Sequence, residues 1–160
     1  MQVMPPTDVS ITRTTVLDAP APTIFALLED FRTWKRWSFW EQTDPNLKRT
    51  YTGPERGVGA HYAWSGNAKA GAGSMEITGA AAGRQVTIDL RFLKPFKATN
   101  PTTITLEPLD GGRTRVNWTM SSKRGAVMRA FSKIVKFDAV LADQIDQSLE
   151  ALGREAAAAQ

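Results

Sequence analysis

Asp138 is the titratable residue whose place in the sequence points most directly to chemistry. Apolar residues recur at spacings of three and four from Val127 to Leu152, which predicts one face of a long α-helix. Asp138 falls on this face, seven residues from both Phe131 and Ile145, so an unbroken helix directs its carboxylate inward. Because a buried carboxylate is costly unless it is paired or neutralised, Asp138 is a candidate for a ligand-facing polar group.

Two roles are open for Asp138. Its carboxylate could hydrogen-bond a hydroxyl or keto group of a ligand, or act as a general acid or base if burial raises its pKa toward neutrality. It could instead accept hydrogen bonds from Tyr62, from the Trp118 indole or from a buried water, and serve only the fold. A helix kink near Phe137 would turn it outward. The pattern shows no second catalytic group, so Asp138 is the only catalytic candidate.

Other residues that could carry chemistry give little support to a metal, nucleotide or hydrolase site. The chain has no cysteine, and His61 is its only histidine, so neither a zinc site nor a Ser-His-Asp triad is expected. His61 is expected to face solvent, because Tyr62 and Trp64 take the opposite face of its strand. The glycine pairs Gly57/Gly59 and Gly71/Gly73 complete no phosphate-binding motif and are interpreted as strand turns. We therefore expect no metal and no cofactor.

Length and charge indicate a single cytoplasmic domain. The 160 residues predict one domain over 1–160, with an ordered core of about 9–153, and the start has no apolar segment typical of a signal peptide. The formal charge is +4, but lysines and arginines are scattered, and a short basic stripe at Arg129, Lys133 and Lys136 is interrupted by nearby acids. We therefore expect no nucleic-acid partner and no stable membrane insertion, and either a monomer or a homodimer.

The elements that must position these residues follow from periodicity. Residues 9–17 alternate apolar and polar side chains before Pro20 and Pro22, which predicts a strand and then a helix through 23–29. A final helix is expected from near Arg124 to Leu152, ending at Gly153 with a frayed alanine-rich tail. Six runs rich in Thr, Val, Ile and aromatics, separated by turns, are interpreted as antiparallel strands: 48–52, 60–65, 74–80, 85–92, 102–108 and 114–120.

A curved antiparallel sheet of about seven strands must cover one apolar face, and the long helix is the obvious cover. The strand alternation predicts that one set of side chains faces this helix and lines either a packed core or a cavity. These are Met75, Ile77, Leu90, Phe92, Trp118 and Met120. We expect an internal pocket of at least ~300 Å³, the lower end for small-molecule sites, lined mostly by apolar side chains.

The order of elements and several motifs resemble the START-like helix-grip fold of the SRPBCC superfamily, in its bacterial polyketide cyclase/dehydrase-like branch. The motifs are Asp30-Phe31 with Trp34, Trp37 and Trp40; Gly57-Val58-Gly59; Tyr62 and Trp64 with Gly66; Gly71-Ala72-Gly73; Lys94-Pro95-Phe96; and Thr114-Arg115-Val116-Asn117-Trp118. Two positions depart from the usual pattern. Phe39 stands where a proline is usual, and Ser148 stands where a glycine usually precedes Leu149.

The resemblance implies an α+β fold, with two short helices after the first strand, and a hydrophobic cavity between the sheet and the C-terminal helix. Trp34, Trp37 and Trp40 are candidates for the cavity entrance, or anchors of the short-helix segment against the long helix. The candidate ligand-binding residues are Tyr62, Trp64, Met75, Ile77, Leu90, Phe92, Trp118, Met120, Phe131, Ile134, Asp138 and Leu141.

Three classes of function follow. The favoured class is a carrier or sensor that encloses a small hydrophobic ligand of lipid, isoprenoid, polyketide or aromatic type. A polyketide cyclase, aromatase or dehydratase is the alternative, and it requires at least two titratable groups that converge in the cavity. A protein-interaction module similar to the co-chaperones of this superfamily is the third, and a filled core would favour it.

Overall fold

The computed structural model describes residues 8–68, 70–94, 97–123 and 133–159, and within them the side chains of residues 10–121 and 139–159. Phe131 and Arg129 lie outside the described residues. Ile134, Asp138, Lys133 and Lys136 lie in a described helix, but their side chains do not belong to the described part. The predictions made for these side chains therefore remain predictions.

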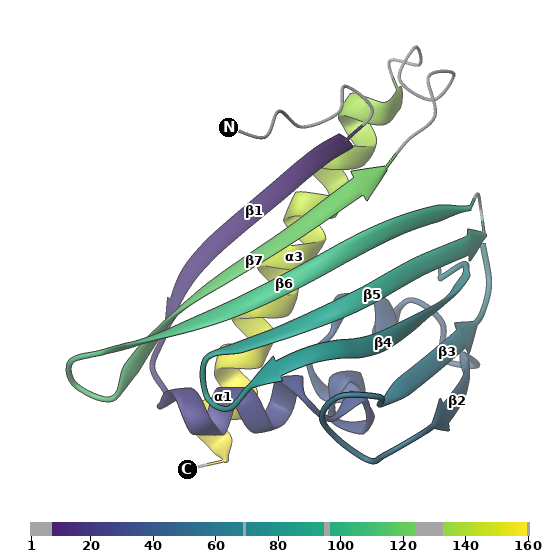
Figure 1. Cartoon of the computed structure of the whole chain (residues 1–160). Helices are drawn as coiled ribbons and strands as arrows, with labels where there is room; N and C mark the ends of the chain where they lie inside the picture. Colours follow the sequence, from purple (N-terminus) through teal and green to yellow (C-terminus); the bar gives the residue numbers. More distant parts are fainter. Residues whose placement is uncertain (1–7, 69, 95–96, 124–132, 160) are drawn as a thin grey trace.

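A seven-stranded antiparallel sheet forms the body of the molecule (Figure 1). Its strands lie in the order β1-β7-β6-β5-β4-β3-β2, so the first strand pairs with the last one. The bounds are β1 Asp8–Leu17, β2 Lys48–Thr52, β3 His61–Ser65, β4 Ala72–Ala81, β5 Gln85–Lys94, β6 Ala98–Leu109 and β7 Arg113–Lys123. The six runs and the first strand predicted from the sequence are all present, which confirms the α+β helix-grip architecture.

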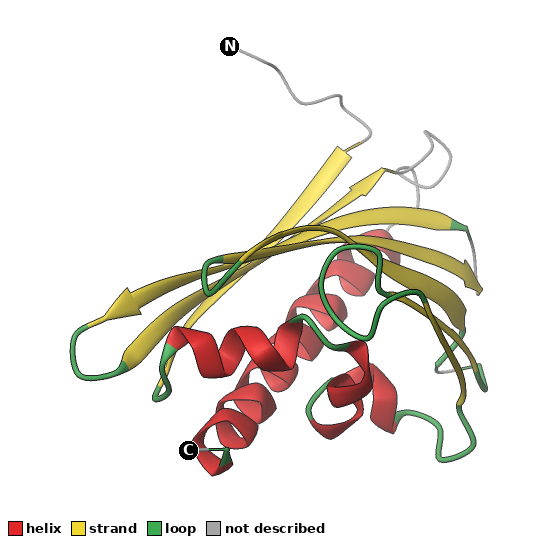
Figure 2. Cartoon of the chain, turned by 60° about the horizontal axis from the view of Figure 1, so that its bottom comes forward, coloured by secondary structure: helices red, strands yellow, loops and turns green. Residues whose placement is uncertain are grey.

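The helices lie together on one face of the sheet (Figure 2). They are α1, Ala21–Leu28; two short 3₁₀ helices, η1, Phe31–Arg36, and η2, Phe39–Gln42; and the long α3, Lys133–Ala158. Pro20 and Pro22 flank the first turn of α1, where proline is tolerated. The Asp30 side chain accepts a hydrogen bond from the Arg32 backbone N–H at 3.0 Å and caps η1.

The core lies between the sheet and these helices, and it has the predicted strand register. In β5, Val86, Ile88 and Leu90 are buried, whereas Gln85 and Arg91 are exposed. In β7 the same alternation buries Val116, Trp118 and Met120. The alternation predicted from the sequence therefore places these side chains on the helix side of the sheet, as expected for a sheet with one covered face.

The predicted end of the long helix at Gly153 is wrong, because α3 continues to Ala158. Gly153 lies against β1: a Cβ atom at this position would be 2.9 Å from Leu17 Cδ2. The glycine therefore allows close packing of helix on strand and does not terminate the helix. Ala156 beyond it is fully buried, which explains why the alanine-rich segment continues as helix.

Candidate functional site

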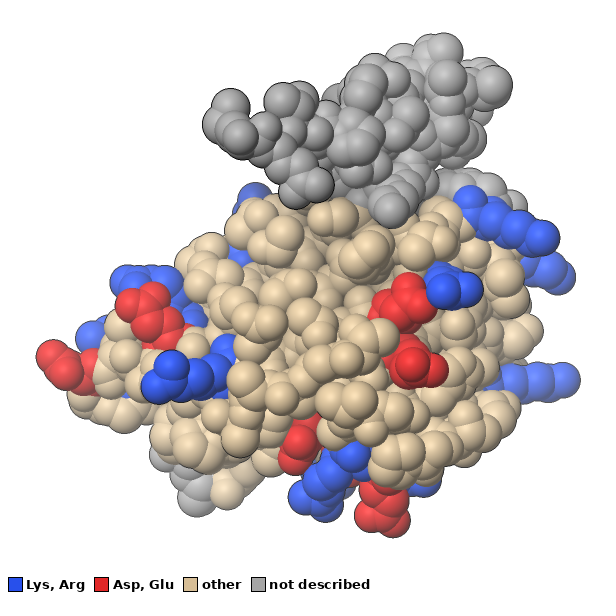
Figure 3. Space-filling view, in the orientation of Figure 1, with Lys and Arg blue, Asp and Glu red and all other residues tan. Residues whose placement is uncertain are grey.

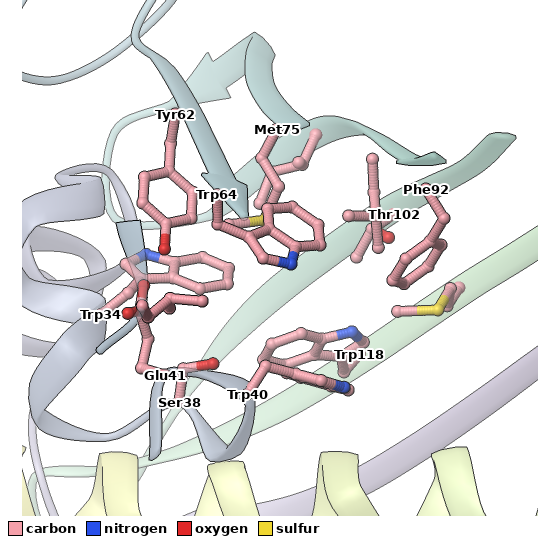
Figure 4. Close-up of a pocket in the computed structure, with 14 residues that line it drawn as sticks. Trp34, Ser38, Trp40, Glu41, Tyr62, Trp64, Met75, Phe92, Thr102 and Trp118 are labelled. Atoms are coloured by element: carbon pink, nitrogen blue, oxygen red, sulfur yellow. The ribbon is translucent and has the colours of Figure 1, made fainter. Parts of the chain in front are cut away.

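A pocket opens between the concave side of the sheet and the short helices η1 and η2 (Figure 4). Its described lining is Trp34, Ser38, Trp40, Glu41, Leu47, Tyr62, Trp64, Met75, Ile88, Leu90, Phe92, Thr102, Trp118 and Met120. The pocket encloses a cavity of about 40 Å³. The enclosed part is thus smaller than the ~300 Å³ expected, because aromatic side chains fill much of the space.

Six of the fourteen described lining residues are aromatic. Trp34 contacts Trp118, with 5.9 Å between ring centroids, and Tyr62 stacks on Trp64, also at 5.9 Å. Phe92 meets Trp64 edge to face at 5.8 Å. Such rings present flat apolar surfaces at low cost in conformational entropy, which suits a planar apolar ligand.

Gly73 in β4 allows Trp64 to lie along this wall. A Cβ atom at Gly73 would be 2.6 Å from Trp64 Cη2 and 2.3 Å from the Arg91 carbonyl oxygen. The Trp64 indole donates a hydrogen bond to the Ala70 carbonyl oxygen at 2.9 Å, which fixes the ring direction. The missing side chain of Gly73 is therefore a requirement of the pocket wall and not only of a turn.

One end of the pocket is polar and carries a buried carboxylate. The side chain of Glu41, in η2, is only 4% exposed. Arg49 Nε, in β2, donates to Glu41 Oε2 at 2.5 Å, and Arg49 Nη2 donates to the Glu41 carbonyl oxygen at 3.3 Å. Because an unpaired buried carboxylate would cost several kcal/mol, the ion pair is what allows Glu41 to line an apolar pocket.

Tyr62 shares this polar end, and Figure 4 shows its hydroxyl directed toward Glu41. Burial, followed by the hydrogen bond to the Glu41 carboxylate, raises the pKa of Tyr62 far above its ordinary value of 10.0. The hydrogen bond that Arg49 donates to the Glu41 carboxylate raises the pKa of Arg49. Tyr62 is consequently a neutral hydrogen-bond donor at all physiological pH values.

The other side of the pocket carries a hydrogen-bond donor that has no partner in the part of the chain that the structure describes. Trp118 Nε1 is fully buried and has no hydrogen-bond partner among the described residues. In Figure 4 the Trp118 indole lies across the gap from Trp64, Thr102 and Phe92. The nearby Thr102 hydroxyl donates to the Asn100 carbonyl oxygen at 3.0 Å and does not accept from Trp118. A buried donor without an acceptor is rare in folded proteins, so Trp118 marks a place where an acceptor belongs.

The segment that carries Trp40 and Glu41 is tied to the long helix. The Phe39 backbone N–H donates to Ser148 Oγ at 2.9 Å, and Ser148 Oγ donates to the Gln144 carbonyl oxygen at 2.9 Å. These are the two positions at which the chain departs from the pattern of its resemblance. Proline at 39 would have no N–H and glycine at 148 no hydroxyl, so the two departures together create one bond.

The structure brings together most of the candidate ligand-binding residues. Tyr62, Trp64, Met75, Leu90, Phe92, Trp118 and Met120 line the pocket, with Trp34 and Trp40 from the short helices. Ile77 and Leu141 are buried in the core and are not part of the described lining. Trp37 is also buried beside Trp34 and Trp118, so it anchors η1 and forms no entrance. His61 is half-buried rather than fully exposed.

Five lining residues were not selected from the sequence: Ser38, Glu41, Leu47, Ile88 and Thr102. Ile88 and Thr102 could have been found by strand alternation, because each is two residues from another inward-facing side chain. Glu41 gave no such signal. It belongs to a short 3₁₀ segment, and its partner Arg49 is reached only after a turn.

The described part of the chain holds neither a metal-binding group nor a membrane-spanning helix. Its His, Asp and Glu side chains form no group that could hold a metal ion, and none of its helices is long and apolar enough to cross a membrane. Figure 3 shows acidic and basic side chains interspersed on the visible face, and much of that surface is uncharged. Some uncharged side chains of the described surface pair with each other, for example the Thr14 hydroxyl, which donates to Asn117 Oδ1 at 2.8 Å.

A curved sheet that packs on a long C-terminal helix, with an aromatic pocket between the sheet and the short helices, defines an SRPBCC-type protein of the helix-grip fold. The chain belongs to the polyketide cyclase/dehydrase and lipid transport family, whose sequence model matches residues 8–157. None of the curated proteins matches it in sequence.

Several solved structures share this fold. A protein from Thermobifida fusca, solved by NMR, has 18% identity and a TM-score of 0.70, with 92% of each chain covered. Norcoclaurine synthase from Thalictrum flavum, solved with dopamine and hydroxybenzaldehyde, has 10% identity and a TM-score of 0.70, over 96% of this chain and 88% of that one. The Aha1 dimer from Colwellia psychrerythraea has 17% identity and a TM-score of 0.60, over 91% and 96%. At these identities the likeness concerns the fold.

Proposed function

We propose that the protein binds a small hydrophobic ligand in the pocket between sheet and short helices, as a carrier or sensor. The observation that carries this proposal is the aromatic pocket itself, which is open to solvent and lined mostly by apolar side chains. A core filled without a gap would have favoured the protein-interaction module instead. The small enclosed volume favours a compact, flat ligand over a long lipid chain.

A cyclase-type or dehydratase-type enzyme is the second candidate, and Glu41 favours it. Glu41 and Tyr62 are two titratable groups that converge in the pocket, which is the arrangement an acid–base mechanism requires. However, Arg49 holds the Glu41 carboxylate in an ion pair. The carrier proposal is favoured because the Glu41 carboxylate is already engaged by Arg49 and by the Tyr62 hydroxyl.

The test is saturable binding of 2-naphthol to the full chain, followed by fluorescence. Leu90→Trp fills the pocket and should abolish saturable binding, because Leu90 is buried in its wall. Leu93→Trp is the matched control: Leu93 lies on the same strand but is 56% exposed and is not part of the lining. Equal binding by both variants would place the dye elsewhere and reject the proposal.

A native mass spectrum of protein purified from its own host would show any retained small molecule. Turnover of that molecule during incubation, lost in Glu41→Gln, would favour the enzyme over the carrier.

A further inference from the structure

We propose that the pocket selects a neutral, planar ligand with one acceptor oxygen, which binds the Trp118 Nε1–H, and that Glu41 excludes ligands carrying a carboxylate. This inference rests on the proposed function and names the chemical class of its ligand. It would assign two specificity-determining residues, one at each side of the pocket.

The pocket wall contains a buried hydrogen-bond donor that has no acceptor in the described part of the chain. Trp118 is 2% exposed, and its Nε1–H has no partner among the described residues. An indole nitrogen can only donate, so its missing partner must be an acceptor. Leaving a buried donor unsatisfied is unfavourable, and a ketone, ether or hydroxyl oxygen in the pocket would remove this penalty by accepting the hydrogen bond.

The charges of the lining side chains also restrict the ligand. Among the described residues that line the pocket, Glu41 is the only ionisable acid or base other than Tyr62, and no lysine or arginine lines it. The cation that balances Glu41 is Arg49, which uses its Nε and Nη2 on Glu41. A second carboxylate in this space would meet an anion in a poorly solvated site and find no lining cation, so fatty acids and aromatic acids are disfavoured.

The shape of the pocket restricts the ligand as well. The enclosed space is narrow and is bounded by indole and phenyl rings, including Trp34, Trp64 and Phe92. A flat ring bearing a carbonyl can stack against these faces while its oxygen points to Trp118. A saturated chain would fill the same space with fewer ring contacts and would leave the indole N–H unpaired.

The test uses three single-ring probes of similar size: acetophenone, isopropylbenzene and benzoate. Their Kd values are measured by NMR titration of the full chain. Trp118→Phe keeps an aromatic ring and removes the N–H, so we expect the ratio of the acetophenone Kd to the isopropylbenzene Kd to rise about two- to tenfold, the worth of one neutral hydrogen bond.

Trp37→Phe is the matched control, because Trp37 Nε1 is also buried without a described partner but Trp37 does not line the pocket. Its Kd ratio should equal that of the wild type. If Trp118→Phe does not fold, the wild-type Trp118 indole N–H resonance replaces it: acetophenone should shift this resonance downfield, and isopropylbenzene should not.

For the charge argument, Glu41→Gln should lower the Kd of benzoate relative to acetophenone by about tenfold, and Glu150→Gln on the exposed face of α3 should not. Binding of the probes with unchanged ratios in Trp118→Phe and Glu41→Gln would overturn this inference while leaving the proposed function intact. Binding of none of the three probes would also overturn this inference, and the proposed function would fail with it only if 2-naphthol did not bind saturably either.

Discussion

The bond between Phe39 and Ser148 makes a quantitative prediction about how the pocket segment is held. Ser148 is fully buried, and its hydroxyl is the acceptor for the Phe39 N–H at 2.9 Å. Ser148→Ala removes this acceptor and leaves a partly buried N–H unsatisfied, at a cost of about 1–3 kcal/mol. Alanine is a better helix former than serine by roughly 0.5 kcal/mol, which offsets part of this cost. We expect a net loss of about 0.5–2.5 kcal/mol in the free energy of unfolding.

Phe39→Pro removes the donor of the same bond. Ser38, which precedes it, has φ −71° and ψ 129°, the extended conformation that a following proline requires. Residue 39 is also the first residue of η2, where proline is tolerated. The variant should therefore fold, and its stability loss should come from the missing N–H and from the lost ring, which contacts Trp40 edge to face at 6.3 Å.

The double variant tests whether the two effects share one cause. Once either partner is gone the bond no longer exists, so the second change should add less than it does alone, and the coupling energy should be about 0.5–1.5 kcal/mol. Urea unfolding of the four proteins measures it, provided that the m values agree. Additive losses, with a coupling near zero, would show that the bond does not stabilise η2 and would refute this account.

Four further predictions concern the pocket and its supports. Because the pKa of Tyr62 is raised above the ordinary 10.0, the native chain keeps a proton that the unfolded chain loses at high pH. The stabilisation from Tyr62 is therefore full below pH 10, and above pH 10 the free energy of unfolding falls by up to about 1.4 kcal/mol per pH unit. Tyr62→Phe should reduce this slope, which unfolding measured at alkaline pH would show. Arg49→Ala should cost about 3–5 kcal/mol in chemical denaturation, since it leaves the Glu41 carboxylate buried without its cation; a loss below 1 kcal/mol would mean that water replaces the pair. Gly73→Ala should cost at least about 1–3 kcal/mol by overpacking against Trp64 and weaken 2-naphthol binding, and an unchanged melting temperature would contradict the packing described. Asp138→Asn should weaken binding of keto or hydroxylated ligands more than of hydrocarbons if the carboxylate meets ligand, whereas a change in stability alone would show a structural role.

Strand alternation was sufficient to predict the sheet and its buried face. Val86, Ile88 and Leu90 share one face because the period of a strand is two, and no tertiary information is needed to see this. The end of α3 could not be predicted in the same way. Gly153 is a helix terminator by local propensity, and its actual role depends on Leu17, a residue more than a hundred positions away.

The polar end of the pocket shows the same limit. The Glu41–Arg49 pair joins a 3₁₀ turn to an edge strand. Arg49 alternates with its neighbours in β2 and shares a face with Tyr51, but the short 3₁₀ segment has no periodicity that marks Glu41 as an inward side chain. Three tryptophans at equal spacing could not be told apart either, because the short helices η1 and η2 are separate elements with different directions. Trp34 and Trp40 reach the pocket and Trp37 does not, which only the arrangement of these elements decides.

The strand order also has a consequence for how the chain folds. β1 pairs only with β7, so Thr14 meets its partner Asn117 across 103 residues of sequence. During synthesis β1 therefore keeps its backbone N–H and C=O groups unpaired until β7, the last strand, has left the ribosome. Closing such a distant pair late makes folding slow for a domain of this size, and β1 is the strand whose weakening should raise aggregation during refolding more than it changes the final stability. Stopped-flow refolding of a variant with Thr12 and Thr14 replaced by alanine, compared with its equilibrium unfolding, would measure the difference.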